Sequence, residues 1–477
     1  MNEMAREWLW VMNVFDLPRW RRWGSRCAML GIPALSALAV VMTLYFAPTK
    51  DTSANWLVLL LGVGIFVTHR AQWPRLAMLR PLVPLALLAA YAILLDWLNP
   101  SADATPLLLR LAIGAAVYAV FHGLFASLRL ARRYLWLLFL FGAPALVHLM
   151  YMYVDIAVWG TAQDGVSLEY AKDAPRIGRR YLSHALIPLL FATWLLGPRL
   201  RPARWLPVVF LVGVGFPILS LALLDARAAY VAILGALGVA MVIAPLRRAL
   251  GRSLRLWQLR IPGFHSLALL LLLATVLVAY AAGQSRWSAM GQSFFAALTD
   301  VRSGGATGAK KPPFADAGYW SRSIEVRCAE NPTRCHVDQS MYLRTAWILH
   351  ALRQLQRHPF GVGQQADLMS FGISREPGAA DRSNNTAGDN FVIEAGLAFG
   401  YVGLALYAWF WWIVIRRGVA AVVDHRRKAL YTLLTLLIGI GILRGFVDVM
   451  SFGLWYYWMG LVGVLYGCLQ QDTVRGR

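Results

Sequence analysis

The stretch PLLLRLAIGAAVYAVFHGLFASL, residues 106–128, is followed almost at once by Arg129, Arg132 and Arg133. A helix needs roughly 20 apolar residues to cross about 30 Å of hydrocarbon, so this stretch predicts a transmembrane helix with a basic end. Similar runs recur along the chain, which predicts an all-α polytopic membrane protein with about 12 transmembrane helices. The predicted spans are residues 27–47, 54–68, 81–98, 106–128, 134–158, 182–197, 205–224, 228–246, 264–283, 390–415, 428–446 and 451–470.

Positive charge collects on alternate connectors between these runs. One set of connectors holds about 26 Lys or Arg against about 5 Asp or Glu, which the positive-inside rule assigns to the cytoplasm. The opposite set holds about 19 Asp or Glu and about as many basic residues, and is therefore nearly neutral. Almost the whole net charge of +22 thus sits on one face. Because topology explains the basicity, a nucleic-acid partner is not expected.

Composition supports a membrane protein, since 58% of the 477 residues are hydrophobic and only 15% are charged. A soluble domain with these values would expose too much apolar surface. An even number of spans places both termini in the cytoplasm, and the first span is interpreted as an anchor. The expected organisation is a cytoplasmic segment 1–26, spans one to nine over 27–283, a large periplasmic loop or lid over 284–389, spans ten to twelve over 390–470, and a cytoplasmic tail 471–477.

The loop 284–389 is the longest outward connector, and long irregular loops normally serve function. Residues 284–338 are rich in Gly, Pro and charge, and are expected to pack loosely; they include Cys328 and Cys335, which either form a periplasmic disulfide or remain free thiols. From 339 to 357 the spacing of apolar residues predicts an amphipathic helix that ends before Pro359. Its predicted apolar stripe consists of Leu343, Trp347, Ile348, Ala351, Leu352 and Leu355.

Two outward arginines stand out. Arg227 lies at the mouth between two spans, where a guanidinium is a functional candidate unless it simply pairs with Asp225 or extends to the membrane interface. Arg344 lies on the loop helix, where it is either an ordinary surface residue or a ligand for phosphate oxygens, which the planar guanidinium binds with paired donors.

Three motifs resemble those of the O-antigen ligase/polymerase superfamily in order, spacing and side of the membrane. They are Asp225-Ala-Arg227-Ala-Ala-Tyr; Arg344-Thr-Ala-Trp followed by Arg357-His358-Pro359-Phe360-Gly361-Val362-Gly363; and Asp389-Asn390-Phe-Val-Ile-Glu394-Ala-Gly396 followed by Gly400-Tyr-Val-Gly403. The resemblance implies a GT-C-type, metal-independent glycosyltransferase with no cofactor, acting on undecaprenyl-pyrophosphate-linked glycan at the periplasmic face of the inner membrane.

Carried over residue by residue, the resemblance makes Arg227 and Arg344 the pyrophosphate ligands. Ligases of this family usually have His-Asn where this chain has Asp389-Asn390. A carboxylate can serve as general base, although Asp before a helix also acts as an N-cap, and both roles can coexist. The missing His favours a polymerase that extends a surface polysaccharide. The alternatives are a ligase that transfers glycan to lipid A-core or to protein, and a polysaccharide or lipid transporter without chemistry.

Further substrate contacts are expected from polar residues close to the outward ends of spans. Arg179, Arg180 and His184 either touch the glycan or second phosphate, or anchor the chain at the interface. His358 is expected to cap or orient the turn rather than to act as base, and His358, Asn390 and Arg444 complete the set of possible substrate contacts.

Overall fold

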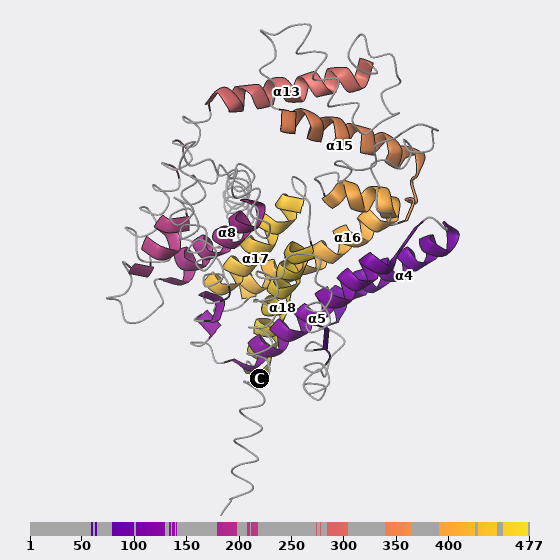
Figure 1. Ribbon diagram of the computed structural model, residues 1–477. Coiled ribbons are helices and arrows are strands. Elements are labelled where there is room, and N and C mark those ends of the chain that lie inside the picture. Colours follow the sequence, from indigo (N-terminus) through magenta and orange to yellow (C-terminus); the bar gives the residue numbers. More distant parts are fainter. Residues whose placement is uncertain are drawn as a thin grey trace, which may run out of the picture.

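All of the regular secondary structure that the computed structural model describes is helical (Figure 1). It describes residues 79–99, 102–128, 179–197, 211–217, 284–303, 339–363, 391–424, 428–445 and 452–475, with isolated positions at 59–63, 133–140, 208–209 and 273–277. Six predicted spans, at 27–47, 54–68, 134–158, 205–224, 228–246 and 264–283, lie wholly or largely outside these residues, so the count of about 12 stays a prediction.

Three described helical stretches are long and apolar enough to cross a membrane: Arg80–Leu98, Thr105–Ser127 and Val392–Val422. The first combines a 3₁₀ turn, η3 (Arg80–Leu82), with α4 (Val83–Leu98), the second is α5 (Thr105–Ser127), and the third lies within α16 (Phe391–Asp424). They coincide with the predicted spans 81–98, 106–128 and 390–415. The all-α membrane class is therefore confirmed for the described chain.

Three further helices match predicted spans closely. They are α8 (Arg179–Leu196), α17 (Lys428–Gly445) and α18 (Phe452–Arg475). A short π-helical segment, η7 (Leu211–Gly215), packs against α8, and α8 in turn packs against α17.

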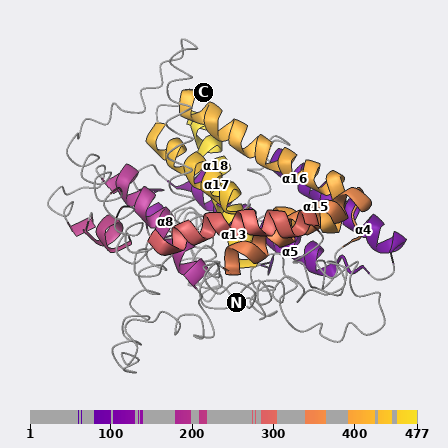
Figure 2. The ribbon, with the colours of Figure 1, turned by 90° about the horizontal axis from the view of Figure 1, so that it is seen from above.

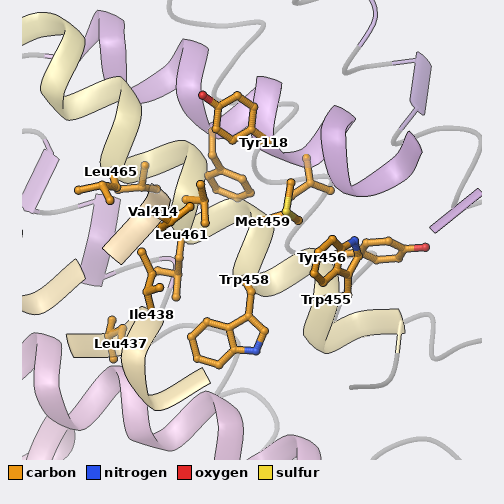
Figure 3. Close-up of a cluster of buried hydrophobic side chains, with 14 of the residues drawn as sticks. Tyr118, Val414, Leu437, Ile438, Trp455, Tyr456, Trp458, Met459, Leu461 and Leu465 are labelled. Atoms are coloured by element: carbon orange, nitrogen blue, oxygen red, sulfur yellow. The ribbon is translucent and has the colours of Figure 1, made fainter. Parts of the chain in front are cut away.

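Helices α5 and α18 make the most extensive contact among the described elements. Glycines on α18 allow it: a Cβ on Gly463 would lie 2.5 Å from the carbonyl oxygen of Tyr118, and one on Gly467 would lie 2.5 Å from that of His122. Lipid is as apolar as a helix surface, so close backbone approach and van der Waals contact hold membrane helices together. Figure 3 shows the adjoining core, in which α18 meets α5, α16 and α17; its labelled residues are Tyr118, Val414, Leu437, Ile438, Trp455, Tyr456, Trp458, Met459, Leu461 and Leu465.

We expect Gly463→Ala to lower the free energy of unfolding in detergent by about 1–3 kcal/mol, because the new methyl group collides with backbone that cannot rotate away. The matched control is Gly439→Ala in α17, where a Cβ meets nothing within 4 Å. Chemical denaturation of both variants checks this, and equal stability of the two would contradict the packing described for α5 and α18.

Basic residues from separate helices gather at one end of the bundle. Arg80 and Arg417 both interact electrostatically with Tyr466 near the end of α18. Arg133, which is fully buried, donates from Nε to the carbonyl of Leu128 at 2.8 Å. These residues belong to connectors and helix ends that the charge pattern assigns to the cytoplasm. Their position at one end of the bundle is consistent with that assignment.

The same end holds a polar contact between the last two described helices. The hydroxyl of Tyr431 donates to Oδ2 of Asp472 at 2.7 Å, and Arg133 interacts electrostatically with Tyr431. Tyr431 lies in the first turn of α17 and Asp472 in the last turn of α18. The hydrogen bond therefore holds these two helix ends together beside the buried guanidinium of Arg133.

Two helices of the large loop, α13 (Gln284–Ser303) and α15 (Gln339–Arg357), pack against each other, and α15 also packs on α16. Figures 1 and 2 show them side by side across one end of the bundle. The expectation of loose packing from residue 284 onward is wrong for 284–303. The apolar residues of this segment have no strong helical spacing, so its packing depends on tertiary contacts. The side chains of Ser293 and Ala297 are small enough to be fully buried.

Candidate functional site

Helix α15 has the bounds that its sequence predicts and presents Arg344 on a defined face. Arg344, Ile348, Ala351 and Leu355 follow one another at spacings of four, three and four residues, so they share one side of the helix. Ala351 and Leu355 are buried, and Leu355 faces Gly396 of α16, where a Cβ would lie 3.6 Å from its Cδ2. Arg344 is half-buried on this face, with its Nε inaccessible to solvent. The guanidinium therefore lies on the side of α15 that packs on α16.

The predicted apolar stripe of α15 is confirmed only in part. Leu352 was expected to be buried with its neighbours, but it is 49% exposed. The side chains of Leu343 and Trp347 lie outside the described residues. Both α13 and α16 pack on α15, and the buried residues of the helix include Tyr342, Thr345 and Ala346, which lie outside the predicted stripe.

The turn after α15 is built by proline and glycine. His358 continues the helix through its backbone N–H, which donates to Gln354 at 2.8 Å, and its carbonyl accepts from Gly361 at 2.9 Å. Gly361 and Gly363 both have φ of +82°, a conformation that side chains disfavour. The His358 side chain is exposed. The predicted role of its side chain, in the turn or as a substrate contact, stays a prediction.

The main departure from the sequence prediction is a sharp bend inside α16. Gly400 has φ of +62° and ψ of −159°, a region essentially confined to glycine, so the predicted span 390–415 is not one continuous helix. A Cβ on Gly396 would lie 3.3 Å from Leu404, which shows how closely the chain folds back. We call residues 391–400 the first limb of α16.

The turn after α15 supplies the hydrogen bonds that the bend releases. The N–H of Tyr401 donates to Pro359 at 2.8 Å, that of Val362 to Leu397 at 3.1 Å, and that of Gly363 to Ala398 at 2.8 Å. Backbone groups of a broken helix must find such partners, above all in a membrane. Two of the three predicted motifs are thus joined through their backbones.

Helix α4 fixes the same turn from the other side. The hydroxyl of Tyr91 donates to the carbonyl of Phe360 at 2.6 Å, and Nδ2 of Asn99 donates to that of Val362 at 2.6 Å. Neither residue could be identified from the sequence, because no local pattern relates α4 to a segment more than 260 positions later. The signal in the sequence is a polar group within the apolar span for Tyr91, and directly after it for Asn99.

We call the hydrogen-bonded contact between the turn at 358–363 and the bend at Gly400 the joint. It fixes where α15 lies relative to the start of α16. Both α15 and the first limb reach the bend with their C-terminal ends, and Figure 1 shows α15 stacked above α16. Arg344, three turns before Leu355, consequently lies toward the beginning of the first limb. Asp389 and Asn390 directly precede that limb in the sequence, but they lie outside the described residues, as does Arg227.

The remaining predicted contacts are described by their backbone alone. Arg179, Arg180 and His184 lie in the first turns of α8, and Arg444 lies in the last turn of α17. Their side chains are outside the described residues, so their predicted roles stay predictions. Within the described chain, no three His, Cys, Asp or Glu side chains lie close enough together to hold a metal ion.

Comparison with known proteins supports the motif assignment. A search of curated proteins found no significant match. Residues 212–408, however, match the family model described as O-antigen ligase. This region contains Arg227, α13, α15, the turn at 358–363 and the bend of α16, so all three predicted motifs fall inside it. The predicted resemblance to the O-antigen ligase/polymerase superfamily is therefore confirmed over residues 212–408, the part of the chain that is similar to this family model.

Proposed function

We propose that the protein transfers glycan from undecaprenyl pyrophosphate to a sugar hydroxyl at the periplasmic face of the inner membrane, most directly as a polymerase of a surface polysaccharide. Arg227 and Arg344 bind the pyrophosphate, and Asp389 is the general base. The observation that carries the proposal is the joint between the turn at 358–363 and the bend of α16, which supports a guanidinium on α15 facing the helix that follows Asp389.

The proposed reaction is a single displacement. The carboxylate of Asp389 takes the proton of the acceptor hydroxyl, whose oxygen attacks the anomeric carbon of the donor sugar. The bond from that carbon to the pyrophosphate oxygen breaks, and undecaprenyl pyrophosphate leaves with the electron pair. The configuration at the anomeric carbon is inverted. Fixed arginines stabilise the charge that develops on the leaving group, and they need no rearrangement as the bond breaks.

We expect Arg344→Ala to weaken donor binding by about 10- to 100-fold, the loss typical of hydrogen bonds to a charged group. Arg227→Ala should act in the same direction. The matched control is Arg357→Ala, which removes the same charge from the exposed end of α15. Titration with a labelled undecaprenyl-pyrophosphate glycan provides the measurement. Donor affinity that is unchanged in Arg344→Ala, or equally reduced in Arg357→Ala, would rule out Arg344 as a pyrophosphate ligand.

A ligase is the second candidate, because the matching family model is described as O-antigen ligase. The two reactions share the donor and differ in acceptor, so reconstitution with a lipid-linked repeat unit and each acceptor separates them. Longer lipid-linked chains identify a polymerase, and labelled lipopolysaccharide or labelled protein identifies a ligase. Movement of the donor without any new glycosidic bond would identify a transporter and overturn the proposal.

A further inference from the structure

The turn at 358–363 is held against the side of α4, below the outward end of that helix. Arg80 belongs to a connector that the charge pattern assigns to the cytoplasm, so Leu98, at the other end of this span, lies at its outward end. Tyr91, whose hydroxyl donates to the carbonyl of Phe360, lies seven residues before Leu98. This separation is about 10 Å along the helix axis, and helical side chains lean further toward the N-terminus. The backbone of Phe360 therefore lies beside the apolar part of α4.

From this level the turn runs back along α4 toward the outward side. Nδ2 of Asn99, the residue that follows α4, donates to the carbonyl of Val362 at 2.6 Å. A Cβ on Gly363 would collide with the side chain of Ala102. Three residues of extended chain span at most about 10 Å, which is enough to connect the level of Tyr91 with that of Ala102. Phe360 thus lies deeper than the end of the turn.

The polar backbone groups of the turn have partners within the protein. Two of its carbonyls accept from the side chains of α4 and its C-cap described above, and two accept from backbone N–H groups of the turn and of α16. The four acceptors belong to His358, Pro359, Phe360 and Val362. A turn in water needs no such partners because solvent supplies them, whereas irregular backbone within a membrane is stable only when the protein supplies them.

The side chain of Phe360, in contrast, points away from the protein and is 67% exposed. Tyr401, whose N–H holds the carbonyl before Phe360, is exposed as well. Three exposed leucines share the side of α4 that carries Tyr91, at four positions before it and three and seven after it. They are Leu87, Leu94 and Leu98. Phe360 therefore extends the exposed apolar side of a helix that is suited to cross a membrane.

We propose that the turn at 358–363 enters the outward half of the membrane and that the side chain of Phe360 contacts the hydrocarbon chains of lipid. The hydrocarbon is about 30 Å thick, so a point about 10 Å below its surface lies in the outward half. A helix tilt of up to about 40° still leaves about 8 Å of this depth. Lipid is the partner of this surface because the surface continues the apolar side of α4. The proposal concerns membrane contact and does not depend on the proposed reaction.

The test measures the surroundings of residue 360 in the full-length protein in proteoliposomes, in a variant whose four native cysteines are replaced. A bimane label on Phe360→Cys should be quenched by brominated acyl chains and not by iodide in the water. Leu94→Cys on α4 is the control for lipid contact, and Gly291→Cys, exposed on α13, is the control for water. Unlabelled Phe360→Cys should react with a membrane-impermeant maleimide at least about 10-fold more slowly than Gly291→Cys, because a thiol in apolar surroundings rarely ionises to the reactive thiolate.

Tyr401→Cys keeps the proposal testable if Phe360→Cys does not fold, as judged by its size-exclusion profile. It should show the same pattern of quenching, because its backbone bonds to the same turn. Quenching by iodide, or reaction with the maleimide as fast as that of Gly291→Cys, would place the turn in water and overturn the proposal. Protection from both quenchers would mean that protein, such as a second copy of the chain, covers Phe360, and this would overturn it too. No outcome depends on glycan transfer, so a failure of the proposed function is measured separately.

Discussion

Replacing Asp389 by Asn is expected to lower kcat by about 10²- to 10⁴-fold, the usual contribution of a positioned general base. The carboxylate is the proton acceptor in the proposed displacement, and an amide of the same shape cannot take that proton. Binding of the lipid-linked donor should be unchanged, since Arg227 and Arg344 carry the pyrophosphate. Single-turnover transfer in proteoliposomes, together with donor titration on the same preparation, measures both quantities.

This substitution also separates the two roles open to Asp389. Asn is as good an N-cap as Asp, so Asp389 would tolerate the exchange if it only capped the helix. Because α16 begins at Phe391, the residue directly before it is Asn390. Asp389→Ala, which removes both the base and any cap, should additionally reduce stability by about 1 kcal/mol. Normal turnover in Asp389→Asn, combined with loss of stability in Asp389→Ala, would leave capping as the role and remove Asp389 as the base.

The second large effect is expected from Gly400→Ala. Its φ and ψ values cost an L-residue about 1–3 kcal/mol in strain, and the new Cβ would overlap the carbonyl oxygen of Pro359. The bend has to open to relieve this overlap, which separates the turn at 358–363 from the first limb. Transfer activity should fall below detection while the α5–α18 packing, which does not include this joint, keeps the protein folded.

A matched control exists in the same region of the chain. Gly291 of α13 is exposed, and a Cβ added to it would meet nothing within 4 Å, so Gly291→Ala should retain full activity. Circular dichroism and detergent size-exclusion profiles of both variants establish that each is folded. Full activity in Gly400→Ala would contradict the assignment of the bend as the element that positions α15 over the site.

Some of this architecture could be predicted from sequence because its causes are local. The apolar spacing from Gln339 and the proline at 359 define α15, and the described helices of the bundle begin and end close to the edges of apolar runs. The charge pattern likewise predicted the gathering of Arg80, Arg133 and Arg417 at one end of the bundle. The bounds of a helix depend on residues that are neighbours in the sequence. The side of the membrane on which a connector lies is predicted from the charge of that connector alone.

The features that could not be predicted depend on contacts between distant segments. An apolar run containing Gly400 has the hydropathy of an uninterrupted span, and only the partners supplied by residues 359–363 make a sharp bend stable there. The same holds for Tyr91 and Asn99, whose acceptors lie in a different part of the chain.

The central claim, that Arg344 and Asp389 face one site, is tested most directly by cross-linking in native membranes. In a variant whose four native cysteines are replaced, Arg344→Cys is combined with Asp389→Cys and treated with a short thiol-reactive reagent. Arg357→Cys with Asp389→Cys is the control, because Arg357 lies about 20 Å further along α15. An intramolecular cross-link for the first pair and none for the second is the predicted result. Cross-linking of the control pair alone would contradict the account.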